Sequence, residues 1–230
     1  MDKNKPVIFV IIPAFNEAKS IDKVIAEIPK DIVDEVIVVN NNSRDETSAV
    51  ARAAGATVLD EPRQGYGFAC LTGIKYAKTK NPEIIVFLDA DYSDYPEEMR
   101  YLIKPITDEG YDMVIGSRAL GNRQGGSMTP QQVFGNWLAT RLLKLIYGVK
   151  YTDLGPFRVI RFDKLLEINM QDTTYGWTVE MQVKAAKLKM KTCELPVNYR
   201  KRIGKSKVSG TIKGTIGAGY KIITTIFKYM

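Results

Sequence analysis

Short apolar runs alternate with amphipathic stretches along the first 118 residues of the chain. The amphipathic stretches repeat apolar residues at intervals of three and four, as Ile21, Val24, Ile25 and Ile28 do after Ser20, a residue that can cap a helix. The apolar runs are rich in β-branched residues, as buried strands are, and they occupy residues 7–12, 36–39, 57–59, 84–88 and 113–115. This alternation predicts an α/β fold in which a mainly parallel sheet is covered by helices on both faces.

The alternation is lost after residue 118. Two helices, at residues 133–147 and 177–188, and a strand at residues 192–197 are predicted there. We therefore divide one domain, residues 1–210, into a first half, 1–118, and a second half, 119–210. Residues 211–230 are a predicted C-terminal amphipathic helix whose apolar stripe contains Ile212, Ile216, Tyr220, Ile223, Phe227 and Met230.

The composition excludes several kinds of active site. The 230 residues include no histidine and only two cysteines, Cys70 and Cys193. A His general base, a Ser-His or Cys-His nucleophile, a His-bound metal and a disulfide framework are therefore excluded. Acid–base or metal chemistry must rest mainly on carboxylates.

Charge is unevenly distributed along the chain. Residues 181–230 hold twelve Lys and Arg against Glu194 alone, a net charge of +11, whereas the whole chain carries +7. The first 180 residues are therefore slightly acidic. A basic C-terminal end predicts an anionic partner there: phosphate, nucleic acid or a membrane surface. No apolar run has the length of a signal peptide or a membrane span, so we expect a cytoplasmic protein.

Polar residues follow three of the predicted strands. They are Asn16 and Glu17 after the first strand, Asn40, Asn41 and Asn42 after the second, and Asp89 and Asp91 after the fourth. Ligands of parallel sheets bind beyond the carboxyl ends of the strands, so these three strand ends could converge on one crevice. The first two groups also have a plainer interpretation as turns, because Asn tolerates positive φ and bonds to its own backbone.

Asp89 and Asp91 make the strongest candidate for a metal site. On an extended strand end, residues i and i+2 point the same way, so both carboxylates face one spot. Two hard oxygen ligands suit Mg²⁺ or Mn²⁺, which usually takes its remaining ligands from waters and substrate phosphates. The alternative is a pair of capping or solvated aspartates before Pro96.

The order of these segments resembles a known family. IPAFNE, VVNNNSRDET, EPRQGYGFACLTGI, FLDADYSDYP and DMVIGSR occur in this order, and LGPFRVIR and YRKRIGKSKVSGT follow them. Together they resemble the family-two glycosyltransferases of the GT-A fold, and within these the dolichyl-phosphate mannose or glucose synthases. The resemblance extends from about Val7 to Thr211. It implies an inverting, metal-dependent hexosyltransferase with a donor half at residues 1–118 and an acceptor half at residues 119–210.

The resemblance implies a nucleotide-sugar donor site in the first half. The residues that would hold the base and ribose are Pro13, Phe15 and Glu17. Asp89 and Asp91, with Ala90 between them, would bind the ribose-diphosphate and a Mg²⁺ or Mn²⁺ ion, and Gly65 would belong to the same site. Asp91 would also count among the catalytic residues.

The resemblance also implies where the anionic groups of the substrates would bind. Arg118 would lie at the sugar or diphosphate side, as a catalytic residue. Arg158, Arg202, Lys205 and Lys207 would receive an anionic acceptor or clamp the diphosphate.

The row Asn40, Asn41 and Asn42 stands where the family commonly has D-D-G-S or D-N-N-S. An Asn carbonyl can accept a hydrogen bond from the ring N–H of a base, and its amide can donate to a base carbonyl. We interpret this row as the turn that reads the base. UDP is the expected nucleotide, and GDP is the alternative.

The acceptor is expected to be a polyprenyl or dolichyl phosphate. An ionised phosphate is itself a nucleophile and suits the Lys- and Arg-rich tail, whereas a hydroxyl would need a carboxylate base. Glu180 is the candidate base if the acceptor is a hydroxyl, and Asp153 is a further candidate. The alternative function is therefore a family-two glycosyltransferase acting on a saccharide hydroxyl in cell-surface polysaccharide synthesis.

Peripheral contact with a membrane follows from the lipid acceptor. The C-terminal helix combines an apolar stripe with flanking lysines, a pattern typical of helices that lie on an anionic membrane. We therefore expect a cytoplasmic protein that is peripheral at the cytoplasmic face of a membrane and binds no nucleic acid.

Overall fold

The computed structural model describes residues 5–204, 206 and 212–230, and its centre is a seven-stranded sheet. The strands are β1 (Ile8–Ala14), β2 (Glu35–Asn40), β3 (Thr57–Asp60), β4 (Ile84–Phe87), β5 (Met113–Ser117), β6 (Arg158–Arg161) and β7 (Thr192–Pro196). Their order in the sheet is β3-β2-β1-β4-β6-β5-β7. Only β6 runs antiparallel to its neighbours, β4 and β5. The prediction of a mainly parallel sheet is confirmed.

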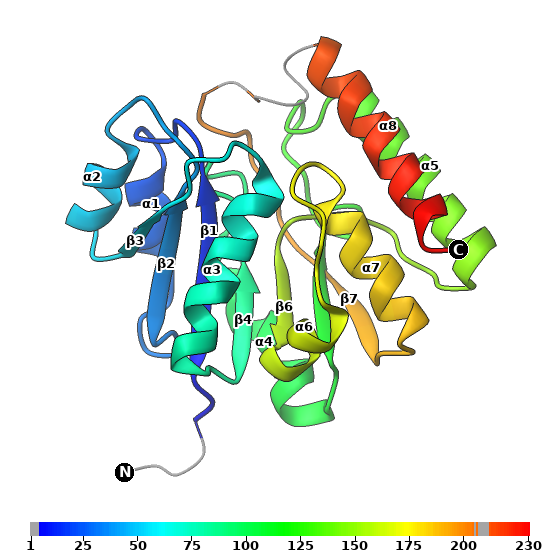
Figure 1. Ribbon diagram of the computed structural model, residues 1–230, viewed down its shortest axis with the longest axis horizontal. Coiled ribbons are helices and arrows are strands. Elements are labelled where there is room, and N and C mark those ends of the chain that lie inside the picture. The colour runs from blue at the N-terminus through cyan, green and yellow to red at the C-terminus, as the bar shows by residue number, and fades with distance from the viewer. Residues whose placement is uncertain (1–4, 205, 207–211) are drawn as a thin grey trace.

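Helices cover both faces of this sheet (Figure 1). They are α1 (Ile21–Glu27), α2 (Thr47–Ala53), α3 (Tyr66–Lys80), the 3₁₀ turn η1 (Pro96–Glu98), α4 (Met99–Glu109), α5 (Pro130–Tyr147), α6 (Phe162–Ile168), α7 (Trp177–Lys187) and α8 (Ile212–Lys228). Buried side chains of α1, α2 and α4 pack on one face, and those of α3, α5, α6, α7 and α8 pack on the other.

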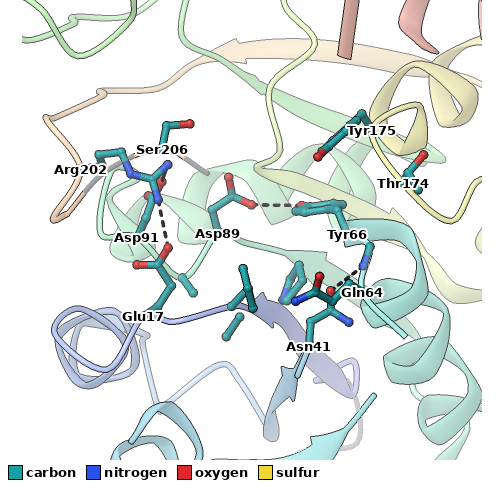
Figure 2. A pocket seen from close by; sticks show the side chains of 15 residues that line it. Glu17, Asn41, Gln64, Tyr66, Asp89, Asp91, Thr174, Tyr175, Arg202 and Ser206 are labelled. Atoms are coloured by element: carbon teal, nitrogen blue, oxygen red, sulfur yellow. Dashed lines mark hydrogen bonds and ion pairs between the residues drawn. The ribbon is translucent and has the colours of Figure 1, made fainter. Parts of the chain in front are cut away.

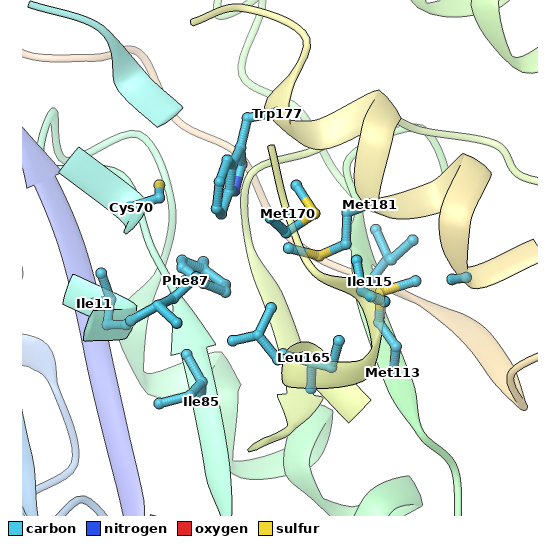
Figure 3. Packing of buried hydrophobic residues seen from close by; sticks show 14 of the residues in the cluster. Ile11, Cys70, Ile85, Phe87, Met113, Ile115, Leu165, Met170, Trp177 and Met181 are labelled. Atoms are coloured by element: carbon cyan, nitrogen blue, oxygen red, sulfur yellow. The ribbon is translucent and has the colours of Figure 1, made fainter. Parts of the chain in front are cut away.

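The two faces explain why the strands read as unbroken apolar runs. In β1, Phe9 and Ile11 belong to one buried cluster, whereas Val10 and Ile12 belong to the cluster on the opposite face. Because successive side chains of a strand point to opposite faces, a strand covered on both sides must be apolar at every position. Figure 3 shows the first cluster, in which Trp177 of α7 meets Phe87 of β4 edge to face.

Three local features differ from the sequence-based prediction. The strand β6 and the helix α6 were not predicted, and they lie between α5 and α7 in the chain. Ser20 precedes α1 without a side-chain cap hydrogen bond; its hydroxyl donates instead to the backbone carbonyl and the carboxylate of Glu17. Thr129, in contrast, opens α5 with a capping box that includes Gln132.

The C-terminal helix α8 lies beside α5 (Figure 1), and the Tyr147 hydroxyl donates to the Ile226 carbonyl at 2.5 Å. Ile226 is buried. Most of the predicted stripe faces outward: Ile216, Tyr220 and Phe227 are 67%, 72% and 50% exposed. Within the described residues, no helix has both the length and the apolar character needed to cross a bilayer.

Candidate active site

A cavity of about 530 Å³ opens at the carboxyl ends of β1, β2 and β4 (Figure 2). Its lining residues are Pro13, Ala14, Phe15, Glu17, Asn41, Gln64, Gly65, Tyr66, Asp89, Ala90, Asp91, Thr174, Tyr175, Arg202 and Ser206. Parallel strands end at the same edge of a sheet, and this brings segments that lie far apart in the sequence into one pocket. Most of the donor-site residues expected from the sequence therefore meet here.

The two aspartates after β4 are held in different ways. The Tyr66 hydroxyl donates to Asp89 at 3.1 Å, and the Ser93 backbone N–H donates to Asp91 at 2.9 Å. Burial, followed by the charge of Asp91, raises the pKa of Asp89 to about 7. Two carboxylates that are costly to ionise side by side make a site that favours a bound cation.

The composition of this cluster limits the kind of metal that fits. Among the described residues, no group of three or more His, Cys, Asp or Glu side chains is arranged to hold a metal ion. The protein therefore offers Asp89 and Asp91 and no full ligand shell. Such a site fits a hard divalent cation that takes further oxygen ligands from water and a diphosphate.

Arg202 already places a positive charge at these carboxylates. Its guanidinium contacts Glu17 and Asp91, each at 3.0 Å. The Ile203 backbone N–H donates to the Asp91 carbonyl at 2.9 Å, so the segment around Arg202 lies across the aspartate loop. Arg202 thus lines the same pocket as Asp89 and Asp91, and Figure 2 shows its ion pair with Glu17 on the side opposite Thr174 and Tyr175. Lys205 and Lys207 lie outside the described residues.

The three asparagines occupy different positions. Asn41 lines the pocket, but its amide donates to the Glu61 and Arg63 carbonyls while its oxygen accepts from the Gly65 N–H at 2.8 Å. Asn40 donates to Asp60 and accepts from the Ser43 N–H, and Asn42 has a positive φ of 61°. Asn40 and Asn42 therefore form a turn outside the pocket lining. Base recognition by this row stays a prediction.

Close backbone contacts require both glycines of the segment EPRQGYG, Gly65 and Gly67. A Cβ on Gly65 would lie 2.3 Å from the Thr173 carbonyl oxygen, and one on Gly67 would lie 2.0 Å from the Asp172 carbonyl oxygen. The loop that contains Asp172 and Thr173 lies directly on the first turn of α3, and the Phe68 N–H donates to the Thr173 carbonyl at 3.1 Å. Glycine is required because the two backbones approach so closely.

Arg118 and Arg158 are buried next to the pocket and do not line it. Arg118 makes a two-pronged ion pair with Asp153, with both contacts at 2.8 Å. Burial alone would raise the pKa of Asp153, but the charge and hydrogen bonds of Arg118 bring it below its ordinary value. Arg158 donates to the Gly155 and Thr178 carbonyls and to Gln182, and burial lowers its pKa to about 10.

Glu180 is fully buried and also lies outside the pocket lining. Its carboxylate accepts from the backbone N–H groups of Gln171 and Asp172 and from the Tyr229 hydroxyl, and it forms an ion pair with Lys184. Its partners in the described part of the chain are thus backbone amides, a phenol and a lysine. No path from Glu180 to a bound acceptor is evident in these contacts.

Sequence reasoning missed several pocket residues. They are Gln64, Tyr66, Thr174, Tyr175 and Ser206. Tyr66 stands between the two required glycines, so the QGYG segment contains a signal for it. Thr174 and Tyr175 come from the connection between α6 and α7, and no local pattern places that connection over the carboxyl end of β4.

The fold belongs to a known structural class. The crystal structure of glucosyl-3-phosphoglycerate synthase from Mycobacterium tuberculosis with Mn²⁺, uridine diphosphate and phosphoglyceric acid has a TM-score of 0.77 to this chain. The two sequences are 22% identical, and the match covers 97% of this chain and 78% of the other. The same enzyme with Mg²⁺ and uridine diphosphate gives a TM-score of 0.73 at 21% identity, covering 97% and 79% of the two chains. The GT-A fold is therefore confirmed.

The family follows from the sequence comparison. The model of glycosyl transferase family 2 matches residues 9–168, and the chain belongs to this family. It is 35% identical over 209 residues to an uncharacterized glycosyltransferase of Mycobacterium tuberculosis, covering 90% of this chain and 92% of that one. It is 30% identical over 221 residues to the undecaprenyl-phosphate mannosyltransferase of Micrococcus luteus, covering 90% and 89%. The dolichyl-phosphate hexose transferase of Haloferax volcanii is 29% identical over 204 residues, covering 86% and 85%. The chain is a glycosyltransferase.

Proposed function

We propose that the protein transfers a hexose from a nucleoside-diphosphate sugar to a polyprenyl phosphate, with inversion at the anomeric carbon. One observation carries the proposal: Arg202 and Ser206 line the pocket, and the basic sequence that contains them is followed along the chain by α8, whose outward side chains are apolar. An acceptor with an anionic head and an apolar tail suits this order of surfaces. The names of the Micrococcus and Haloferax relatives support it.

The donor half of the mechanism rests on the pocket. Asp89 and Asp91 would hold Mg²⁺ or Mn²⁺, which supplies positive charge against the diphosphate that leaves. Tyr66 orients the Asp89 carboxylate through its hydrogen bond. Arg202, now paired with Glu17 and Asp91, is within the same pocket and offers a second positive charge to the diphosphate.

The acceptor half needs no proton transfer if the acceptor is a phosphate. An ionised phosphate oxygen attacks the anomeric carbon directly, and the bond to the nucleoside diphosphate breaks on the opposite side. No general base is then required, which agrees with the burial of Glu180, whose carboxylate accepts hydrogen bonds from the Asp172 N–H and the Tyr229 hydroxyl. Lys205 and Lys207 remain the proposed ligands of the acceptor phosphate, on sequence grounds alone.

Activity with matched donors and acceptors tests this proposal. We expect hexose transfer to a short polyprenyl phosphate, with UDP-glucose preferred over GDP-mannose, and little transfer to the corresponding polyprenol or to a saccharide. Replacing Lys205 and Lys207 together by alanine should lower kcat/KM for the lipid phosphate roughly ten- to a hundredfold for each lost charge-assisted contact, with nucleotide binding retained. Transfer to a saccharide hydroxyl, with no loss in the double variant, would show that the alternative function is correct.

The proposed membrane contact rests on the exposed stripe of α8. Replacing Ile216 and Phe227 together by serine should weaken binding to anionic phospholipid vesicles at least tenfold, because each side chain gains about 1.5–3 kcal/mol when fully buried. Sedimentation with vesicles measures this. Leu166→Ser is the control, since Leu166 is an exposed apolar residue of α6, away from α8. Equal vesicle binding by the wild type, the double variant and Leu166→Ser would exclude α8 as the membrane contact. The proposed transfer reaction would still stand.

A further inference from the structure

One wall of the donor pocket is a loop that is held between α3 on one side and residues of α7 and α8 on the other. Residues 171–176 belong to the connection between α6 and α7 and bring Thr174 and Tyr175 to the pocket. Figure 2 shows these two side chains together on one side of the pocket, across from Glu17 and Arg202. On its pocket side the loop rests on the first turn of α3, through Gly67 and the Phe68 N–H.

The opposite side of this loop is organised by two buried carboxylates. Glu180 accepts from the Gln171 N–H at 3.0 Å and from the Asp172 N–H at 2.6 Å. Asp172 in turn accepts from the Thr174 N–H at 2.7 Å and the Gly176 N–H at 3.1 Å. The backbone of the loop is therefore closed around these two side chains.

Lys221 and Thr225 of α8, and Tyr229 directly after its last residue, contact this assembly. The Tyr229 hydroxyl donates to Glu180 at 2.7 Å, and Lys221 forms an ion pair with Asp172 at 3.0 Å. Thr225 is 4% exposed and lies against Gly176, where an added Cβ would be 2.6 Å from its hydroxyl oxygen. Lys221, Thr225 and Tyr229 follow one another at intervals of four, so they share one face of the helix.

The geometry points to α8 and the residue after it as the part of the chain that positions the wall of the donor pocket formed by Thr174 and Tyr175. Tyr229 and Lys221 are positioning residues: they act through Glu180 and Asp172 on the loop that presents Thr174 and Tyr175 to the donor. This inference rests on the proposed donor site, and it makes the C-terminal helix part of donor binding as well as of membrane contact. Glu180 then serves to hold the loop in place.

Replacing Tyr229 by phenylalanine tests the inference with the loss of one hydroxyl. A hydrogen bond to a charged, buried group is lost, so we expect amide hydrogen exchange in residues 171–176 of the protein without nucleotide to rise about tenfold. In the same variant KM for the nucleotide sugar should rise about tenfold, while kcat and KM for the acceptor stay within a factor of two. The Lys221 side chain is 42% exposed, so we expect Lys221→Gln to fold normally and to raise the loop exchange rate and the donor KM in the same direction.

Tyr147→Phe is the matched control. It also removes one tyrosine hydroxyl, which donates a hydrogen bond to the Ile226 carbonyl of α8. This hydrogen bond does not involve the loop at residues 171–176. Normal loop exchange and normal donor KM in Tyr229→Phe and Lys221→Gln would overturn the inference, as would equal changes in Tyr147→Phe. If the wild type bound neither UDP nor GDP with Mn²⁺, the proposed donor site would fail, whereas the exchange experiment would still report on the link between α8 and the loop.

Discussion

Replacing Asp91 by alanine is expected to abolish the part of nucleotide binding that depends on Mg²⁺ or Mn²⁺. Asp91 is 6% exposed and stands with Asp89 at the end of β4, and the described residues form no group of three or more His, Cys, Asp or Glu side chains that could hold a cation. Removing one partner of a buried charge pair costs about 2–5 kcal/mol, a thirtyfold or greater loss of affinity. Calorimetric titration of UDP in the presence and absence of Mn²⁺ measures the difference.

Asp108→Ala provides the control for this experiment, because Asp108 is an exposed aspartate of α4. It should bind UDP and Mn²⁺ as the wild type does. Asp91→Ala also removes one contact of Arg202, which keeps its ion pair with Glu17, so metal-independent binding is expected to change little. Undiminished binding with Mn²⁺ in Asp91→Ala would place the metal elsewhere.

The sequence was sufficient for the part of the fold in which each strand is apolar at every position. The strands β1, β2 and β4 are buried on both faces, so their side chains leave an unbroken apolar signal, and their polar ends mark the site. The sequence also indicates Gly65 as a residue of the site, and Gly65 lines the pocket. What the local pattern could not show is that Gly67 is required by a loop more than 100 residues later.

The strand β6 was missed for a physical reason. It has only four residues, and Arg158 and Arg161 enclose just two apolar ones, so the apolar run is too short to predict a strand. Arg158 is nevertheless fully buried, because carbonyls of Gly155 and Thr178 and the side chain of Gln182 satisfy its guanidinium. A buried cation compensated by distant hydrogen-bond acceptors leaves no periodic signal in the sequence.

The roles of Arg202 and Glu180 depend on long-range contacts in the same way. Arg202 meets Glu17, which lies 185 residues earlier, and Glu180 meets Tyr229, which lies 49 residues later. The sequence leaves open whether Arg202 receives an anionic acceptor or clamps the diphosphate. Its place in the donor pocket leads us to expect a loss in donor binding as well.

The two faces of α8 also change how the helix should be tested. Its outward residues include Ile216 and Phe227, whereas Lys221, together with Tyr229 just after the helix, contacts the carboxylates that hold the loop at residues 171–176. Deleting the helix would therefore alter vesicle binding and the donor pocket together. Point substitutions on one face at a time separate these effects, because residues on opposite faces share no contacts.

Gly67→Ala is expected to disable donor binding through a single methyl group. The new Cβ would lie 2.0 Å from the Asp172 carbonyl oxygen, well inside van der Waals contact, so the loop must move away from α3. We expect a stability loss of about 1–3 kcal/mol and a roughly hundredfold fall in kcat/KM for the donor, since Thr174 and Tyr175 move with the loop. Thermal unfolding and donor kinetics measure the two effects.

Gly135→Ala is the matched control. Gly135 lies within α5 with open space around its Cβ position, and the same substitution should stabilise the protein by about 0.5–1 kcal/mol. Wild-type stability and donor KM in Gly67→Ala would show that the loop does not rest on α3 as described, and the link from α8 to the pocket would lose its fixed point.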